Sequence, residues 1–555
     1  MAKDYYKLVT EKEAEFGSLF SRMDKDKDLL ILKSFSLVDK DSKIAPDVDN
    51  ITLNDPQTFF NQVQSNLIAA NMQTVVEGDK LKDKETTFIE DFIQDIELAI
   101  ESRLQARGIP SLRLFNIQQI LGRGRVASRI CLRMDGDEFV PDVLPLDARY
   151  LIYDVGINGL KWAAYKTTRT KAQVEDEYGL EVKQSNPVII DFWDDEVEVV
   201  LAGREVIREQ KHPYKCVPFI IQLSPTGLFY EDEDRFQYMG ESIFAADREL
   251  YEAKNKMGSI LMTITMGSFY AGLQYESEAG TQAQKPERPP YGKRFVVPVE
   301  KGAGYKLMPV RDIGNATRWL YQMIDSALQR GSLPAVSYGN LTFPLSAVAI
   351  TSLTEAEDPV YLPRMQGLAL FYQRLYRMLI DQYVEQKMKV KLGDSGFQKE
   401  YPFGELDKDY AIKFKFFSTS PKQNIANYQI AASARQFVSD DTIRRDILQL
   451  ENPDKELAKR LSEMADQMVP TLALYKMAKA KIDEGDDIGA QLIANQLGIT
   501  LQQLASGKLA EKPKEAAQPE KPLLPLMEGE GGMVRPGVSS AKRAAQLGTE
   551  QEVEE

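Results

Sequence analysis

The chain has 555 residues, of which 43% are hydrophobic and 27% are charged. These are ordinary globular values, and they exclude a wholly disordered, collagen-like or disulfide-stapled protein. The formal net charge of −14 argues against a general nucleic-acid coat, whose affinity comes from neutralising phosphates. Two cysteines, Cys131 and Cys216, and an N-terminus without a signal-like pattern favour synthesis in a reducing, intracellular compartment.

The first 240 residues are predicted to mix helices with short strands. Asn54, Asp55 and Pro56 are typical of a helix start, and amphipathic spacing predicts helices over 50–71 and 87–107. Runs of β-prone residues bounded by turn residues predict strands at 129–134, 150–154, 160–167, 188–193, 196–201 and 218–223. We therefore expect a β-rich platform surrounded by helices.

Two helices with regular apolar seams are predicted next. From Ile243, small or apolar residues recur at spacings of three and four, namely Ala246, Leu250, Ala253, Met257, Ile260 and Ile264. A second helix, over 315–330, has a seam formed by Ala316, Leu320, Met323 and Ala327. The prolines of 286–304 predict a turn-rich insertion between the two helices. An ordinary core helix of one subunit explains the first seam equally well.

Segment 331–354 contains no charged residue, although more than a quarter of the chain is charged. Four residues make it a poor membrane-spanning helix: Pro334, Gly339, Asn340 and Pro344. We therefore interpret this segment as a neutral loop.

Beyond the neutral loop, the sequence predicts a long helix over 359–389, a strand over 410–417 and helices through 423–498. The long helix is expected to turn inward Met365, Leu368, Tyr372, Leu375 and Leu379. Ser439 is expected to cap a later helix. Segment 506–555 contains five prolines and little to bury, so it is expected to be disordered.

Motifs for catalysis or metal binding receive little support. Asp24, Asp26 and Asp28 imitate the start of a calcium loop, but the required glycine and glutamate are absent. The single histidine, His212, has only Cys216 nearby, which does not make a structural zinc site. We expect these two residues in a loop before a strand. We also expect no enzymatic activity and no metal or other cofactor.

The order of these segments resembles that of portal proteins, the head-to-tail connectors of tailed double-stranded DNA bacteriophages. Three local runs are also similar to portal sequences: 143–150 (VLPLDARY) before a strand, 239–255 at the opening of the first seam helix, and 439–448 near the helical end. The resemblance covers roughly residues 50–500, and it rests mainly on the order of the segments.

The resemblance implies an α+β protomer that assembles into a ring, usually of twelve copies. The implied segments are an α/β wing (1–239), two stem helices (240–266 and 314–332), a small clip (267–313), a channel loop (333–357), a long helix with further wing (358–423), a helical crown (424–504) and a disordered tail (505–555). The ring would be made in the host cytoplasm and sit at one capsid vertex of the virion.

The resemblance also implies the partners of the ring. Double-stranded DNA would pass through the channel during packaging and ejection. The packaging terminase, and later the head-to-tail adaptor, would dock on the clip. The major capsid and scaffolding proteins would be further partners, and no membrane is implied.

A helix of about 25 residues is roughly 37 Å long and lies opposite about 20 phosphates of a DNA duplex. A basic lining of that length would hold DNA, whereas an acidic ring with few cations and a neutral constriction would let it slide. We therefore hypothesise sparse phosphate contacts from Lys254, Lys256, Arg318 and Arg330. We place nearest the DNA a channel loop that includes Tyr338, Asn340, Phe343 and Leu345. An intersubunit salt bridge is the alternative role for each cation.

Two other functions stay open on the sequence alone. A tail or baseplate adaptor would not touch DNA, and the absence of a ring with a duplex-sized hole would favour it over a portal. A metal-dependent nuclease or phosphotransferase would use the acidic clusters at 194–196 and 231–234. Magnesium-dependent turnover of DNA or ATP, lost on mutation of Asp194 and Asp195, would identify the enzyme.

Overall fold

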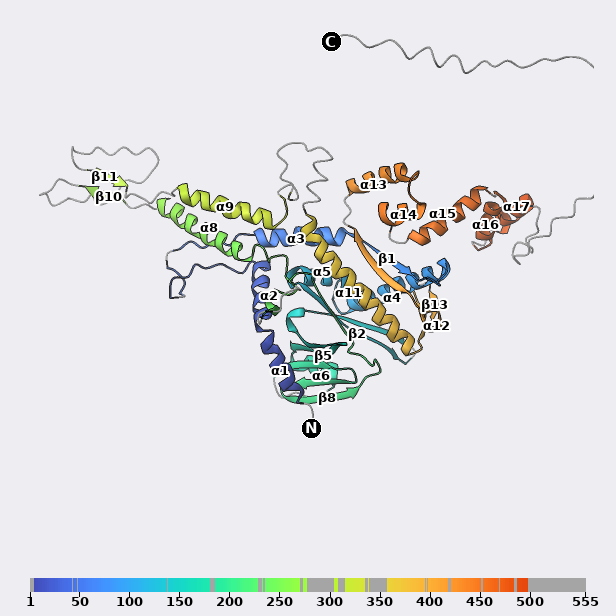
Figure 1. The fold of residues 1–555 in the computed structure, drawn as a ribbon, viewed down its shortest axis with the longest axis horizontal. Helices are drawn as coiled ribbons and strands as arrows, with labels where there is room; N and C mark the ends of the chain where they lie inside the picture. Colours follow the sequence, from blue (N-terminus) through green and yellow to red (C-terminus); the bar gives the residue numbers. More distant parts are fainter. Residues whose placement is uncertain are drawn as a thin grey trace, which may run out of the picture. The chain divides into compact units, whose positions relative to one another are not determined.

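Figure 1 shows the computed structural model of the chain, which forms two compact units, Met1–Lys459 and Arg460–Glu555. The structure describes residues 4–41, 43–46, 48–136, 138–179, 185–227, 232, 235–269, 273–276, 304–307, 315–334, 338, 357–394, 396, 398–417, 421–450, 453–468, 470–483 and 487–497. Most of the predicted clip and channel loop and the whole of the predicted tail therefore lie outside the described residues.

The first part of the larger unit is mainly helical. Its elements are α1 (Tyr5–Glu15), α2 (Gly17–Leu30), α3 (Asp55–Ala69), β1 (Asn71–Glu77), α4 (Asp83–Ala106) and α5 (Leu112–Gly122). The two helices predicted here are confirmed as α3 and α4. Pro56 lies in the first turn of α3, where its missing N–H costs nothing. Ser111 caps α5 by accepting the backbone N–H of Leu114.

Antiparallel sheets form the predicted β-rich platform. The strand order is β4-β5-β6-β7-β8 in one sheet and β3-β2-β9 in another. The strands are β2 (Arg125–Asp135), β3 (Glu138–Leu146), β4 (Leu151–Gly156), β5 (Gly159–Thr168), β6 (Val188–Trp193), β7 (Val197–Ala202), β8 (Glu205–Lys211) and β9 (Phe219–Leu223). Between them in sequence lie η1 (Ala148–Tyr150) and α6 (Lys171–Tyr178), and α7 (Arg235–Tyr238) follows β9. All six predicted strands are confirmed, and the mixture of helices and sheets confirms the α+β class.

The sequence analysis missed β3 because this strand contains Pro141 and Pro145. Proline lacks the N–H that a central strand needs, so it argues against a strand. In the structure β3 is an edge strand that pairs with β2 alone. An edge strand needs only half of its backbone groups for pairing, and proline is tolerated there.

The long helix α11 (Asp358–Glu385) lies within a large apolar cluster and packs against β2, β9 and α5. All of its predicted inward residues are buried: Met365, Leu368, Tyr372, Leu375 and Leu379. A continuous apolar stripe of this length on a helix is stable only when it is buried in a core. The predicted inward face of this helix is therefore confirmed.

Helices α8 (Arg248–Phe269) and α9 (Asn315–Gly331) lie side by side (Figure 1). The strands β10 (Leu273–Glu276) and β11 (Gly304–Leu307), between them in sequence, pair antiparallel. The predicted start of the first seam helix, near 240–243, is wrong. Ile243 is buried ahead of α8, and Ala246 lies exposed in a turn. Gly240, with a φ of 68°, and a hydrogen bond from Ser242 to Asp26 hold this stretch outside the helix.

The remaining elements of the larger unit follow α11. They are β12 (Lys389–Leu392), β13 (Lys399–Pro402), α12 (Phe403–Leu406), β14 (Ala411–Phe417), α13 (Pro421–Ala434), α14 (Asp440–Thr442) and a π-helical turn (Ile443–Ile447). β14 pairs with β1, and β12 pairs with β13. Ser439 caps α14 as predicted, because its hydroxyl accepts the Thr442 N–H.

Helices also make up the described part of the smaller unit. The helix α15 (Pro453–Met468) runs across the boundary, and α16 (Pro470–Asp483) packs against α17 (Asp487–Leu497). The helical character predicted for 423–498 is therefore confirmed.

Candidate functional site

We call the pair formed by α8 and α9 the stem hairpin. A buried lysine on α8 joins the two helices to each other and to α3. Lys254 is 7% exposed, and its Nζ lies 2.8 Å from Oδ1 of Asp325 on α9 and 2.9 Å from Oδ1 of Asp55 on α3. Burial alone would lower the pKa of Lys254, but the hydrogen bonds to both carboxylates outweigh it and raise that pKa. The ammonium group is therefore turned into the chain, with partners inside one copy.

Three of the four predicted cations remain exposed on the stem hairpin: Lys256, Arg318 and Arg330. Lys254, by contrast, is buried and paired with two carboxylates of its own chain, so in this structure its charge is not exposed to a phosphate. Glu249 and Glu252 are exposed near the base. Beyond Lys256, segment 257–269 of α8 carries no charged residue. The hairpin is therefore sparsely charged, and the acidic lining expected from the sequence is not what its exposed residues provide.

The outward face of α9 carries an apolar patch among polar residues. Ile324 and Leu328 are 7% and 5% exposed and pack into the core of the chain. Trp319, Leu320 and Met323, by contrast, are 69%, 38% and 47% exposed. Leu320 and Met323 of the predicted seam therefore face away from the core, because the helix uses the adjoining stripe for its own packing. The exposed tryptophan was missed by the sequence analysis.

An extended segment lies along another face of α8. Between α2 and α3, residues 33–54 form what we call the arm. A ladder of three hydrogen bonds of 2.9 to 3.0 Å joins the backbone N–H groups of Leu53, Ile51 and Asp49 to the side chains of Asn255, Ser259 and Thr263, respectively. The acceptors lie four residues apart on the helix, a rise of about 6 Å, and the donors lie two residues apart on the extended arm, a rise of about 6.6 Å. Because these two spacings nearly match, each donor lies opposite its acceptor. The sequence analysis missed this arm, although the Asn, Ser and Thr recur at i, i+4 and i+8.

One predicted loop residue lies beside the buried lysine. Tyr338 is half-buried and lines a cavity of about 310 Å³ together with Tyr251, Lys254 and Asp325. Burial raises the pKa of Tyr338. The other predicted loop residues, Asn340, Phe343 and Leu345, lie outside the described residues.

A buried carboxylate stands at the junction of α8 with the end of α9. Asp247 is 1% exposed, and a Cβ at Gly331 would overlap its carboxylate. Within the described part of the chain, Oδ2 of Asp247 has no hydrogen-bond partner. Burial raises the pKa of Asp247 to about 6. Position 331, where the neutral loop begins, can therefore hold only glycine without a shift of this carboxylate.

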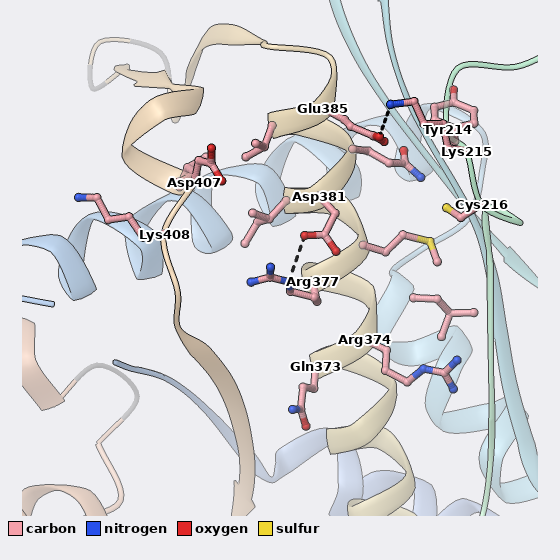
Figure 2. A pocket seen from close by; sticks show the side chains of 16 residues that line it. Tyr214, Lys215, Cys216, Gln373, Arg374, Arg377, Asp381, Glu385, Asp407 and Lys408 are labelled. Carbon is pink, nitrogen blue, oxygen red and sulfur yellow. Dashed lines mark hydrogen bonds and ion pairs between the residues drawn. The ribbon is translucent and has the colours of Figure 1, made fainter. Parts of the chain in front are cut away.

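Away from the stem hairpin, a groove of about 680 Å³ runs along the second half of α11 (Figure 2). Its charges pair within the chain: Arg377 with Asp381 at 3.0 Å, and Lys215 with Glu385 at 2.7 Å. Burial raises the pKa of Cys216 in this groove, which disfavours the reactive thiolate. The groove therefore offers neither a free charge cluster nor an activated nucleophile among these residues.

The residues of the rejected motifs serve the fold. Asp26 binds the Arg248 guanidinium at 2.6 Å, and the Asp194 carboxylate accepts the backbone N–H groups of Glu196 and Val197 in a turn. The Nε2–H of His212 donates to the backbone carbonyl oxygen of Asp194, 3.0 Å away. His212 and Cys216 lie in the loop before β9, as predicted.

The described residues contain no group of three or more His, Cys, Asp or Glu side chains placed to hold a metal ion. None of the helices they form combines the length and the apolar character that crossing a membrane requires.

By sequence, no family and no characterised protein matches the chain. Solved structures that are similar to it include the following two. The first, "Neck of empty GTA particle computed with C6 symmetry", is 14% identical with a TM-score of 0.41, and the match covers 72% of this chain and 90% of that chain. The second, "Virion of native gene transfer agent (GTA) particle", is 12% identical with a TM-score of 0.37, and the match covers 71% of this chain and 89% of that chain.

Proposed function

We propose that the chain is the portal subunit of a tailed double-stranded DNA bacteriophage or a related particle. Copies of the chain form a ring at one capsid vertex, and the stem hairpins surround a channel through which DNA is packaged and ejected. The observation that carries this proposal is the stem hairpin itself, with its long antiparallel helices, its sparse charge and the exposed apolar patch on α9.

The charge of the stem hairpin supports passage rather than retention of DNA. α8 is about 33 Å long and would lie opposite about 20 phosphates. Each cation that neutralises a phosphate adds salt-dependent affinity, and a continuous basic lining would make that affinity large. The exposed cations of the two helices are Lys256, Arg318 and Arg330. Glu252 offsets one of them, whereas Glu249 pairs with Lys25. A duplex can slide past a lining with so little net attraction.

The apolar face of α9 supports assembly. Trp319, Leu320 and Met323 expose adjoining apolar surface to water, and contiguous apolar surface of this kind marks an interaction site. Burying apolar area gains about 25 cal/mol per Å², so contact with a neighbouring copy would favour a ring.

The proposal also includes the further properties of a portal. The terminase and then the head-to-tail adaptor dock near β10 and β11, where the stem hairpin ends. The major capsid and scaffolding proteins are further partners at the vertex. The chain itself acts as a conduit and a platform without enzymatic chemistry.

Negative-stain imaging of the purified protein tests the proposal. We expect rings with a central hole wide enough for a DNA duplex, and a stable monomer under assembly conditions would overturn the proposal. Packaging separates a portal from a tail adaptor. Empty capsids that lack the ring should fail to take up DNA, whereas capsids that lack only a tail adaptor would still fill.

A further inference from the structure

The arm presents an apolar patch of its own. The two ends of the arm run back alongside each other and are joined by two hydrogen bonds of 2.8 Å. The backbone N–H of Phe35 donates to the Thr52 hydroxyl, and the backbone N–H of Leu37 donates to the Asn50 side-chain oxygen. Near its turn, Val38 and Ile44 form an antiparallel bridge. They are 55% and 66% exposed, so the arm ends in two adjoining apolar side chains that face solvent.

The arm and α9 occupy different faces of α8. Lys254 points to α9, whereas Asn255, the first residue of the hydrogen-bond ladder, points to the arm. Successive residues of a helix are about 100° apart. The stem hairpin therefore carries one apolar patch on the arm side and another on the outward face of α9.

The two patches lie at similar heights along the stem hairpin. The ion pair of Lys254 with Asp325 sets the register of the antiparallel helices. Counting from this pair, Trp319 is roughly level with residue 260, next to Ser259 in the middle of the ladder. Val38 and Ile44 lie farther along the arm, within about two helical turns of that level.

The charges of the two surfaces are complementary. From residue 33 to residue 49 the arm contains three lysines and four aspartates. Lys33 pairs with Asp28 outside the arm, which leaves two lysines against four aspartates and a net charge of −2. α9 carries Arg318, Arg330 and Asp325. Because Asp325 pairs with Lys254 of α8, the unpaired charges of α9 are the two arginines, a net charge of +2. Complementary potentials favour the docking of one surface on the other and fix its orientation.

We propose that the arm of one copy packs against the outward face of α9 in the next copy, with Val38 and Ile44 against Trp319, Leu320 and Met323. Two different patches that complement each other make a heterologous contact, and such a contact closes into a ring when its rotation allows. The inference rests on the proposed function, because it assigns the contact by which the ring would close.

Photo-crosslinking tests this contact. Ile44 is replaced by benzoylphenylalanine, and rings are assembled from mixed isotopically light and heavy chains. We expect light–heavy cross-links whose partner peptide contains residues 315–331. Benzoylphenylalanine at Leu98, an apolar residue on α4 that is 44% exposed, is the matched control and should give no cross-link to that peptide.

Charge reversal provides a second measurement. Asp41→Lys, next to the patch of the arm, and Arg318→Asp on α9 should each lower the yield of the cross-link, and the double variant should restore it. Rings that form without light–heavy cross-links to 315–331 would overturn the inference and leave the proposed function standing. Protein that forms no rings at all would overturn the proposed function, and this inference with it.

Discussion

The buried carboxylate of Asp247 gives the sharpest prediction about stability. Replacing it with asparagine keeps the shape and removes the charge. One pKa unit corresponds to 1.36 kcal/mol, so a rise from 3.8 to about 6 corresponds to about 3 kcal/mol. Because the folded-state pKa is raised, the native state loses stability as the pH rises from about 4 through about 6. Asp247→Asn should therefore stabilise the larger unit by up to about 3 kcal/mol at pH 7.5 and by little at pH 4.

Urea unfolding at both pH values, at one protein concentration and in one assembly state, measures this difference. Asp394→Asn, at an exposed aspartate after β12, is the matched control and should change the free energy of unfolding by less than about 0.5 kcal/mol. The reasoning would be refuted if Asp247→Asn lowered stability at pH 7.5, or if its gain were equal at both pH values.

The remaining predictions concern the stem hairpin. Lys254→Met leaves two carboxylates without their cation, so it should lower the free energy of unfolding in urea by about 1–3 kcal/mol. The control Lys256→Met, at an exposed site, should lower it by less than about 0.5 kcal/mol. Ser259→Ala removes the middle acceptor of the hydrogen-bond ladder and should lower the free energy of unfolding by about 1 kcal/mol. Backbone hydrogen exchange in peptide 48–54 should become faster, and unchanged exchange would contradict the ladder. Lys256→Glu should weaken DNA retention in filled particles, and equal retention would remove this residue from the channel.

The sequence was sufficient to predict elements that depend on a single interaction, either the burial of apolar side chains or a local hydrogen bond. The inward stripe of α11 is apolar throughout, so burial alone places Leu368, Tyr372 and Leu375. The capping of α14 by Ser439 is equally local, since a hydroxyl and a backbone N–H three residues on make the contact.

The sequence could not show which surfaces meet when distant parts of the chain pack together. On α9, two neighbouring stripes are apolar, and only contact with the body of the chain selects Ile324 and Leu328 over Leu320 and Met323. Lys254 looks like any surface cation until Asp325, on another helix, is brought beside it. The arm was missed because Asn, Ser and Thr within a helix are usually solvated, and their partners here lie some 200 residues earlier.

Electron cryo-microscopy of the assembled protein tests the central claim most directly, because it locates the stem hairpin relative to the symmetry axis. The account predicts a closed annulus with α8 and α9 beside the central channel and Lys256 turned toward it. An annulus that places α8 and α9 on its outer rim, or protein that stays monomeric, would contradict the account.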